Sequence, residues 1–385
     1  MTARWSRRIV FGDVDAMFAS SAITANPSLA GKLVAVGSPP PRGIITSASY
    51  AARRCGITAA MPTAHALRLC PDLVLVPTDR PLYERLHEQM RVVTGRFFPI
   101  CDWTSIDEFY ADATDLQALH PDPMELGLAV KTAIFDATGL CCTIGVATGK
   151  TVAKIAADSH KPDGLAVIDP GTEADFLAPR PVRSLPGIGP KTAAELESLG
   201  IKVIADFLDI RFEPVLRRLW GARLAAVQAL ARGVDPEPVV PDREAKSIGH
   251  ETTFEQDTDD LALLEGTLRD FLAELAHDLR LQSLAAGAFT VKLKDAKFAI
   301  TTRQRHFSQP LNYDPSMWRS IQPALRSLVL NGRKYRLVGL SLSDLVPATE
   351  SLFDQQTGKA LAAMDAIIEK HGTGVIRLGG IPEES

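Results

Sequence analysis

The sequence lacks the cysteine pattern of a disulfide scaffold or of a zinc site. Its five cysteines are odd in number, and no pair has CxxC spacing; they are Cys55, Cys70, Cys101, Cys141 and Cys142. Such an arrangement predicts free thiols, which persist in a reducing compartment. We therefore expect a cytoplasmic protein.

Long apolar runs are also missing. No stretch approaches the roughly 18 apolar residues of a membrane-spanning helix. The basic start MTARWSRRIVF is interrupted by Asp13 and Asp15, which a signal peptide would not tolerate, so we expect neither export nor a membrane anchor. A hydrophobic fraction of 46% with 23% charged residues excludes wholesale disorder, and 385 residues predict two or three domains.

Net charge is small but unevenly distributed. The stretch from Arg280 to Leu340 holds eleven Lys or Arg against Asp295 and Asp314, a balance of +9, which leaves −13 for the rest of a chain whose total is −4. A basic module on an acidic body is typical of a chain that turns one face to nucleic-acid phosphates. The alternative is a solvated surface with uneven charge.

A proline-rich, acidic segment at 232–245 reads as a linker and separates two regions. Before it, short strand-like runs such as RIVFGDVD, LVAVG, TSIDEFYAD and CCTIGVA alternate with helical patterns, which favours an α/β or α+β fold. After it, the periodicity predicts β-α-β-β-α-β over 246–346, with helices at 261–279 and 318–330. One face of that sheet would be free and would carry Lys292, Lys294, Lys297, Arg303 and Arg305.

Two acidic clusters follow strand-like runs, in IVFGDVDAMF and TSIDEFYADAT. If the fold gathers Asp13, Asp15, Asp107 and Glu108, their mutual repulsion calls for a hard cation such as Mg²⁺. Two such ions can support in-line phosphoryl transfer. Taken singly, either cluster is more typical of turn formers or helix caps.

Four segments, in this order, resemble Y-family DNA polymerases, and the DNA polymerase IV branch in particular. They are FGDVDAMFAS, SIDEFYAD, TIGVATGKTVAKIAADSHKPDG and LPGIGPKTAAELESLGI, and the resemblance runs from about residue 8 to 345. It implies a right-hand α+β polymerase that copies damaged templates with low fidelity and has no proofreading domain. The implied domains are a palm (1–23 and 78–168), fingers (24–77), a thumb (169–231), the linker, a little finger (246–346) and a tail (347–385).

The resemblance also implies the reaction, which is attack of a primer 3′-hydroxyl on a dNTP with release of pyrophosphate. Asp13 and Asp107 would hold two Mg²⁺ ions with the carbonyl of Val14, and Glu108 would bind the catalytic ion. Asp15 would be structural. Mn²⁺ suits the same oxygen ligands.

In the same way, Tyr50, Arg53 and Lys161 match residues that hold the triphosphate, and Ser47 keeps a hydroxyl donor there. A guanidinium fork suits phosphate oxygens. Phe18 occupies the position of the steric gate that excludes a 2′-hydroxyl. Alone, it would read as a core residue.

Several positions depart from the family pattern. Met17 replaces an aromatic residue before the gate, Gly149 and Ser49 each replace an asparagine, and Trp103-Thr104 precedes SIDE. None of these removes an implied metal or phosphate ligand, so they bear on fidelity and lesion preference.

LPGIGPKTAAELESLGI has the pattern of a helix-hairpin-helix, in which Gly187, Gly189 and Lys191 would contact a DNA phosphate. Two alternatives stay open here. A helix-hairpin-helix glycosylase would use Asp206, although VIADFLDIR looks more like a helix start. A polymerase-like accessory protein would lack catalysis.

Near the end, TESLFD resembles a sliding-clamp peptide, with Leu352 and Phe353 as anchors but without its glutamine. A packing pair is the alternative. The expected partners are therefore primer-template DNA, dNTPs and a clamp, and the family implies a monomer.

Overall fold

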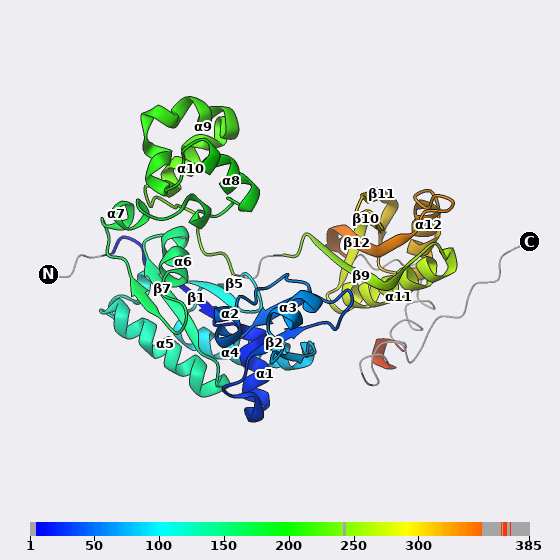
Figure 1. Cartoon of the computed structure of the whole chain (residues 1–385), viewed down its shortest axis with the longest axis horizontal. Coiled ribbons are helices and arrows are strands. Elements are labelled where there is room, and N and C mark those ends of the chain that lie inside the picture. Colours follow the sequence, from blue (N-terminus) through cyan, green and yellow to red (C-terminus); the bar gives the residue numbers. More distant parts are fainter. Residues whose placement is uncertain (1–4, 242–243, 349–362, 364, 368–369, 371–385) are drawn as a thin grey trace, which may run out of the picture. The chain divides into compact units, whose positions relative to one another are not determined.

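The computed structural model describes residues 5–241, 244–348, 363, 365–367 and 370 (Figure 1). The chain divides into two compact units, Met1–Arg243 and Glu244–Ser385, and the division falls in the predicted linker. Leu352 and Phe353 lie outside the described residues. Within the described part, every helix is too short or too polar to span a bilayer.

A five-stranded sheet forms the centre of the first unit. Its strands are β1 (Ile9–Val14), β5 (Cys101–Trp103), β6 (Glu108–Asp112), β7 (Cys142–Ala147) and β8 (Leu165–Val167), in the order β5-β6-β1-β7-β8. β1 lies antiparallel between β6 and β7. Because β1 is apolar on both faces, it can serve as the buried middle strand.

Alternate residues of β1 enter two separate cores. Val10 and Val14 pack with α4 (Arg80–Phe97) and α5 (Pro123–Thr138) on one face. Ile9 and Phe11 pack with α6 (Lys150–Asp158) on the other. Gly145 of β7 allows α6 to approach closely, because a Cβ there would lie 2.0 Å from the Ala153 carbonyl oxygen. The central sheet is therefore fixed from both sides.

A smaller sheet of order β3-β2-β4 packs on the helix that follows β1. The strands are β2 (Val34–Gly37), β3 (Ile45–Ala48) and β4 (Val74–Val76), and the helices are α1 (Met17–Ala25), α2 (Tyr50–Arg54) and α3 (Thr63–Leu69). A single 3-10 turn, η1, spans Pro27–Leu29.

Residues 173–231 of the first unit are helical. The α-helices are α7 (Glu173–Leu177), α8 (Pro190–Ser198), α9 (Glu213–Trp220) and α10 (Leu224–Ala231), joined by short 3-10 turns that include η3 (Val182–Ser184) and η4 (Ile204–Leu208). Leu196, Phe207 and Leu216 share one core with α6, so this helical part is packed onto the sheet.

The start of the linker is bound to the first unit. Asp235 Oδ2 accepts hydrogen bonds from the Thr151 amide and the Thr151 hydroxyl, each at 2.8 Å. Glu237 forms an ion pair with Lys150 at 3.1 Å. Gly149, the N-cap of α6, provides no side-chain cap. Asp235 thus supplies the cap that this helix needs.

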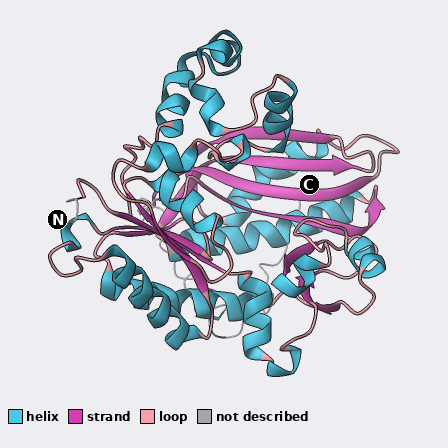
Figure 2. Ribbon diagram, turned by 60° about the vertical axis from the view of Figure 1, so that its left-hand side comes forward, coloured by secondary structure: helices cyan, strands magenta, loops and turns pink. Residues whose placement is uncertain are grey.

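The second unit confirms the predicted β-α-β-β-α-β order. It contains β9 (Ser247–Thr258), α11 (Leu261–Leu281), β10 (Leu284–Asp295), β11 (Ile300–Leu311), α12 (Asp314–Arg326) and β12 (Tyr335–Pro347). The sheet is fully antiparallel, in the order β11-β10-β12-β9. Figure 2 shows strands in magenta, helices in cyan and loops in pink. The predicted helix 318–330 was misplaced by four residues at each end, because Asp314-Pro315 begins the helix and Pro323 lies inside it.

The expectation that lysines and arginines share the free face of this sheet is wrong. Arg303 lies opposite Val291 and Arg305 opposite Phe289, both of which belong to the core under the helices. Lys292 and Lys294 pair with Thr302 and Ile300, on the other face. Directly opposed residues share a face, so the two basic pairs point to opposite sides. β11 is an edge strand, which leaves Arg305 exposed although it is on the covered side.

We predict that Asp235→Ala lowers the free energy of unfolding by about 1–2 kcal/mol, the usual cost of losing a helix cap. Urea unfolding of the full chain measures this. Asp235→Asn keeps an oxygen that can accept from the Thr151 amide, so its loss should be smaller. An unchanged midpoint for Asp235→Ala would contradict the capping role.

Candidate active site

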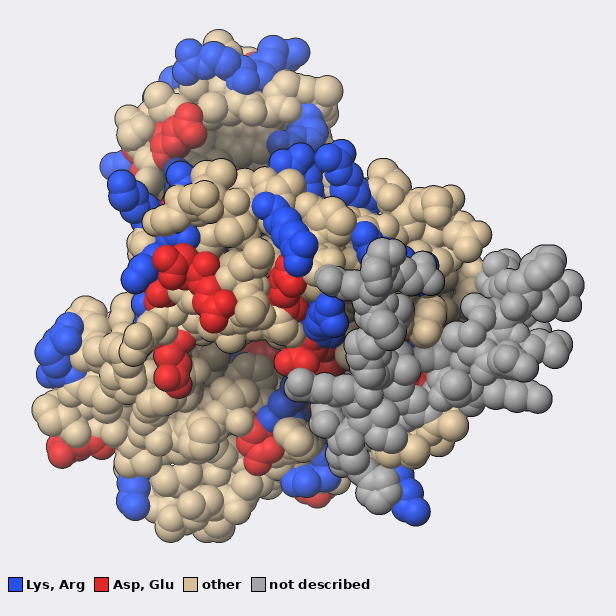
Figure 3. Space-filling view, turned by 90° about the vertical axis from the view of Figure 1, so that its right-hand side faces the viewer, with Lys and Arg blue, Asp and Glu red and all other residues tan. Residues whose placement is uncertain are grey.

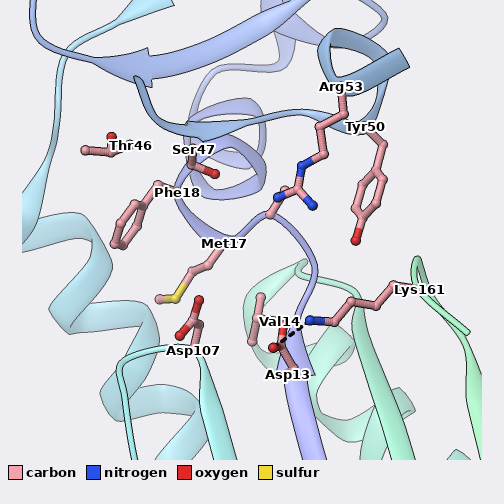
Figure 4. A pocket seen from close by; sticks show the side chains of 11 residues that line it. Asp13, Val14, Met17, Phe18, Thr46, Ser47, Tyr50, Arg53, Asp107 and Lys161 are labelled. Atoms are coloured by element: carbon pink, nitrogen blue, oxygen red, sulfur yellow. Dashed lines mark ion pairs between the residues drawn. The ribbon is translucent and has the colours of Figure 1, made fainter. Parts of the chain in front are cut away.

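A cavity of about 200 Å³ opens where β1 meets α1, next to the smaller sheet (Figure 4). Its lining gathers side chains from distant parts of the chain: Asp13, Val14, Ala16, Met17, Phe18, Thr46, Ser47, Tyr50, Arg53, Asp107 and Lys161. Every residue predicted for metal or nucleotide binding lies in this lining except Glu108. Asp13 and Asp107 lie at one end together with Lys161, which is ion-paired with Asp13, and Arg53 lies at the other end beside Tyr50, as Figure 4 shows.

Strand pairing brings the carboxylates together. Asp13 at the end of β1 lies directly opposite Glu108 at the start of β6. The Val14 amide donates to the Asp107 carbonyl at 2.8 Å, which fixes the loop before β6 against β1. Glu108 therefore borders the cavity beside Asp13 although it does not line it.

Each carboxylate already has a local partner. Asp13 forms an ion pair with Lys161 at 2.6 Å, and Glu108 forms one with Lys154 at 2.5 Å. The Thr104 hydroxyl donates to the other oxygen of Glu108 at 2.9 Å, and the Ser105 hydroxyl donates to Asp107 at 2.5 Å. These contacts offset the repulsion among three neighbouring acids.

The pKa shifts follow from burial and these lysines. Burial raises the pKa of Asp13 to about 6, although Lys161 and Lys154 act to lower it. Burial also raises the pKa of Glu108, but the hydrogen bond and charge of Lys154 outweigh it, so the net shift is downward. For Lys161, burial lowers the pKa, but the ion pairs with Asp13 and Asp158 raise it by more, so the net shift of the pKa is upward. At Asp13 the effect of burial on the pKa outweighs that of the lysine charges.

The donor set suits a hard cation. Among the described residues, no three His, Cys, Asp or Glu side chains stand close enough to enclose a metal as they are placed here. Their oxygens are instead directed to lysines and hydroxyls. Carboxylates with a nearby backbone carbonyl are the ligands that Mg²⁺ prefers, so the residues present fit this ion.

Asp15 has a different environment from the other acids. It is 4% exposed, and its carboxylate accepts hydrogen bonds from the Tyr50 hydroxyl, the Thr143 hydroxyl and the Asp163 amide. The Tyr50 bond measures 3.0 Å and the Asp163 bond 2.7 Å. Its oxygens are committed to the protein, which agrees with the structural role expected for Asp15.

At the other end of the cavity, α2 positions Tyr50 and Arg53. Ser49 caps this helix, with its side chain accepting from the Ala52 amide. The Arg53 Nε donates to the Ala48 carbonyl at 2.9 Å, and its guanidinium lies 4.6 Å from the centre of the Tyr50 ring. The other guanidinium nitrogens point into the cavity (Figure 4). Fixed in this way, they can bind an anion bidentately.

Phe18 forms part of the cavity wall and is held from behind. Its ring stacks on that of Tyr83 from α4, with centroids 4.4 Å apart. Tyr83 is 2% exposed, so its ring is packed in the core and prevents the Phe18 ring from moving away from the cavity. Met17 is buried beside it. The sequence pattern did not reveal Tyr83, because nothing in the spacing links it to residue 18.

Other site residues were also missed. Ala16 and Thr46 line the cavity, and Ala16 adopts the left-handed region with φ of 48°, a strained backbone for alanine. Lys154 was missed as well. Its position one helical turn after Lys150 is the sequence signal that could have identified it.

The predicted hairpin residues are remote from this cavity. Gly187 has φ of 86°, and Gly189 is the N-cap of α8, with Lys191 exposed just after it. Asp206 accepts from the Lys202 and Val203 amides at 2.7 and 2.9 Å. Because this is a local cap, the structure gives Asp206 no catalytic setting. Figure 3 shows Lys and Arg side chains gathered at the top of the view, the end of the first unit where Figure 1 places α9.

Family models and known proteins are similar to this chain over most of its length. The impB/mucB/samB family model matches residues 12–158, its C-terminal domain model matches 245–357, and the HHH motif model of the same family matches 170–201. DNA polymerase IV of Methanoculleus marisnigri is 39% identical, over 88% of this chain and 95% of that protein. DNA polymerase IV of Halorhodospira halophila is 36% identical, over 89% and 96%.

Solved structures are also similar. The Y-family DNA polymerase chimera Dbh-Dpo4(243-245)-Dbh has a TM-score of 0.81 and 27% identity, covering 88% of this chain and 99% of that one. An insertion ternary complex of Dbh DNA polymerase has a TM-score of 0.65 with the same coverage and identity. The predicted multidomain α+β polymerase fold is thereby confirmed. The chain belongs to the Y family of DNA polymerases, in its DNA polymerase IV branch.

Proposed function

We propose that the cavity at the end of β1 is the nucleotidyl-transfer site of this DNA-directed DNA polymerase, and that it copies damaged templates. One observation supports this most strongly. Asp13 and Asp107 line the same cavity as Tyr50, Arg53 and Lys161, so oxygen donors for a cation face groups that bind phosphate. Attack by a primer 3′-hydroxyl on a dNTP needs both kinds of group in one site.

Asp13, Asp107, Glu108 and the Val14 carbonyl would hold two Mg²⁺ ions. When bound, the ions activate the hydroxyl and neutralise the leaving pyrophosphate. The protein holds these carboxylates at the ends of two paired strands, and their oxygens would turn from the lysines and hydroxyls to the ions. Mn²⁺ suits the same ligands.

The incoming nucleotide would be bound by other groups that line the same cavity. Tyr50, Arg53 and Lys161 would contact the triphosphate, with the Ser47 hydroxyl as a further donor. The Phe18 ring, backed by Tyr83, would lie against C2′ of the sugar and exclude a ribose hydroxyl. Met17 would fill the floor beneath it.

We assign the palm to 1–23 and 78–168, the fingers to 24–77, the thumb to 169–231, the linker to 232–245, the little finger to 246–346 and the tail to 347–385. Gly187, Gly189 and Lys191 of the thumb would bind a duplex phosphate. The little finger would use Lys292, Lys294, Lys297, Arg303 and Arg305. Such contacts position DNA without reading its sequence.

The expected setting is the cytoplasm, with the chain acting as a monomer. We also propose a sliding clamp as partner, bound through Leu352 and Phe353. The leading alternative is an accessory protein that binds DNA but does not extend it.

The double variant Asp107→Ala/Glu108→Ala should lose primer extension by roughly 10³-fold or more, because the ions contribute several kcal/mol of transition-state stabilisation. Extension of a defined primer-template with Mg²⁺ or Mn²⁺ measures this. Asp136→Ala, an exposed carboxylate on α5, serves as the control and should retain activity. If wild type binds primer-template but extends it with neither ion, the accessory-protein alternative is correct.

Phe18→Ala should reduce discrimination against ribonucleotides by about 10- to 200-fold, the range of a steric pocket contact. Single-nucleotide kinetics with dNTP and rNTP provide the ratio of kcat/KM. Phe18→Tyr keeps the ring on Tyr83 and should keep the discrimination. Equal ratios in wild type and Phe18→Ala would refute the gate.

The salt dependence of DNA binding can show which of the two basic pairs of the little finger contacts phosphate. The logarithm of the DNA-binding constant falls linearly with the logarithm of the salt concentration. Removing one charge that binds a phosphate should make this slope less negative by about 0.9. We compare Lys292→Gln/Lys294→Gln with Arg303→Gln/Arg305→Gln by DNA titration at several salt concentrations. We expect replacement of either pair to make the slope less negative, because Lys292 and Lys294 lie on the face away from the core and Arg305 is exposed at the edge of the sheet. A pair whose replacement leaves the slope unchanged does not bind phosphate.

A further inference from the structure

Two lysines of α6 lie over aromatic rings of the central sheet. The Lys154 ammonium is 4.5 Å from the centre of the Phe11 ring on β1, and the Lys150 ammonium is 4.8 Å from that of Tyr110 on β6. The two rings are themselves in contact, with centroids 4.8 Å apart. Both lysines are therefore fixed in the same manner, one helical turn apart.

Their ionic partners differ. Lys150 pairs with Glu237 of the linker at 3.1 Å, whereas Lys154 pairs with Glu108 at 2.5 Å. Lys154 is 30% exposed and Glu108 25%, so this pair is shielded from much of the solvent. With Thr104 on its other oxygen, Glu108 has both oxygens engaged.

We propose that Lys154 is a positioning residue of the polymerase: it is the resident counter-ion of Glu108 and sets the concentration of divalent metal that loads the site. This rests on the proposed metal-binding role of Glu108. The ammonium holds the carboxylate beside Asp13 in the metal-free enzyme. A divalent ion must compete with it for the same oxygen.

The competition is specific to Lys154. Lys161 neutralises Asp13 in a similar way, but it lines the nucleotide cavity, where a triphosphate offers it a new partner. Lys154 is held by the Phe11 ring beneath it and does not line that cavity. It therefore stays near Glu108 when a metal arrives, and its positive charge weakens binding of a divalent cation to that carboxylate.

The test is a titration of the full chain with Mn²⁺ in the absence of DNA and nucleotide. The electron paramagnetic resonance signal of the free ion reports how much Mn²⁺ is bound. Lys154→Met should bind Mn²⁺ about tenfold more tightly than wild type, because the competing charge is removed. Lys150→Met is the matched control, since Lys150 lies on the same helix and over a neighbouring aromatic ring but pairs with a different acid, and it should match wild type within about twofold. Lys154→Arg keeps the charge and should also resemble wild type.

Activity provides a second readout. In primer extension, Lys154→Met should reach half-maximal rate at a lower Mg²⁺ concentration, yet its rate at saturating Mg²⁺ should fall because Glu108 is no longer held in place. A purely structural role would instead lower stability without changing the metal concentration needed. Thermal unfolding of each variant, together with Lys154→Gln, verifies that the chain is folded.

The outcomes are distinguishable. If wild type binds Mn²⁺ and folded Lys154→Met binds it equally or more weakly, the proposal for Lys154 is wrong and the metal site stands. If neither protein binds Mn²⁺ while both bind primer-template, the metal assignment of Glu108 is wrong, and the role of Lys154 fails with it.

Discussion

Repulsion among acids is the constraint on which this site depends. β1 and β6 end side by side, which places Asp13 opposite Glu108 and next to Asp107. Such a cluster is costly unless cations or hydrogen-bond donors compensate for it. Lys154 from α6 and Lys161 from the loop after it supply the positive charge. The carboxylates are thus neutralised when no metal is bound, and a metal ion could still replace the lysines as their partner.

Packing makes this compensation possible. The strand β1 has a core on each face, so its end cannot move to relieve the repulsion. α6 reaches the sheet only because Gly145 has no side chain. That approach brings Lys154 close enough to form an ion pair with Glu108. The packed sheet and the close approach of α6 therefore place a compensating charge next to Glu108.

The sequence predicted much of the fold and most of the cavity lining. Periodicity identified the β-α-β-β-α-β unit, since leucine spacing and strict alternation are local signals. It failed for Arg303 and Arg305, whose face depends on pairing register with β10, and no local pattern encodes register. Tyr83 and Lys154 were missed for a related reason: each acts through a contact across elements, with Phe18 and Glu108 respectively.

Gly149 shows why a departure from a family motif does not by itself indicate lost function. An asparagine, which the motif usually has here, could cap α6 itself, whereas glycine cannot. A Cβ at this position would lie 2.9 Å from the Asp235 Cβ, so the missing side chain is what admits the linker. Asp235 then bonds to Thr151 in its place. The cap has moved to another part of the chain, and with it the start of the linker has become attached to the helix that carries Lys154.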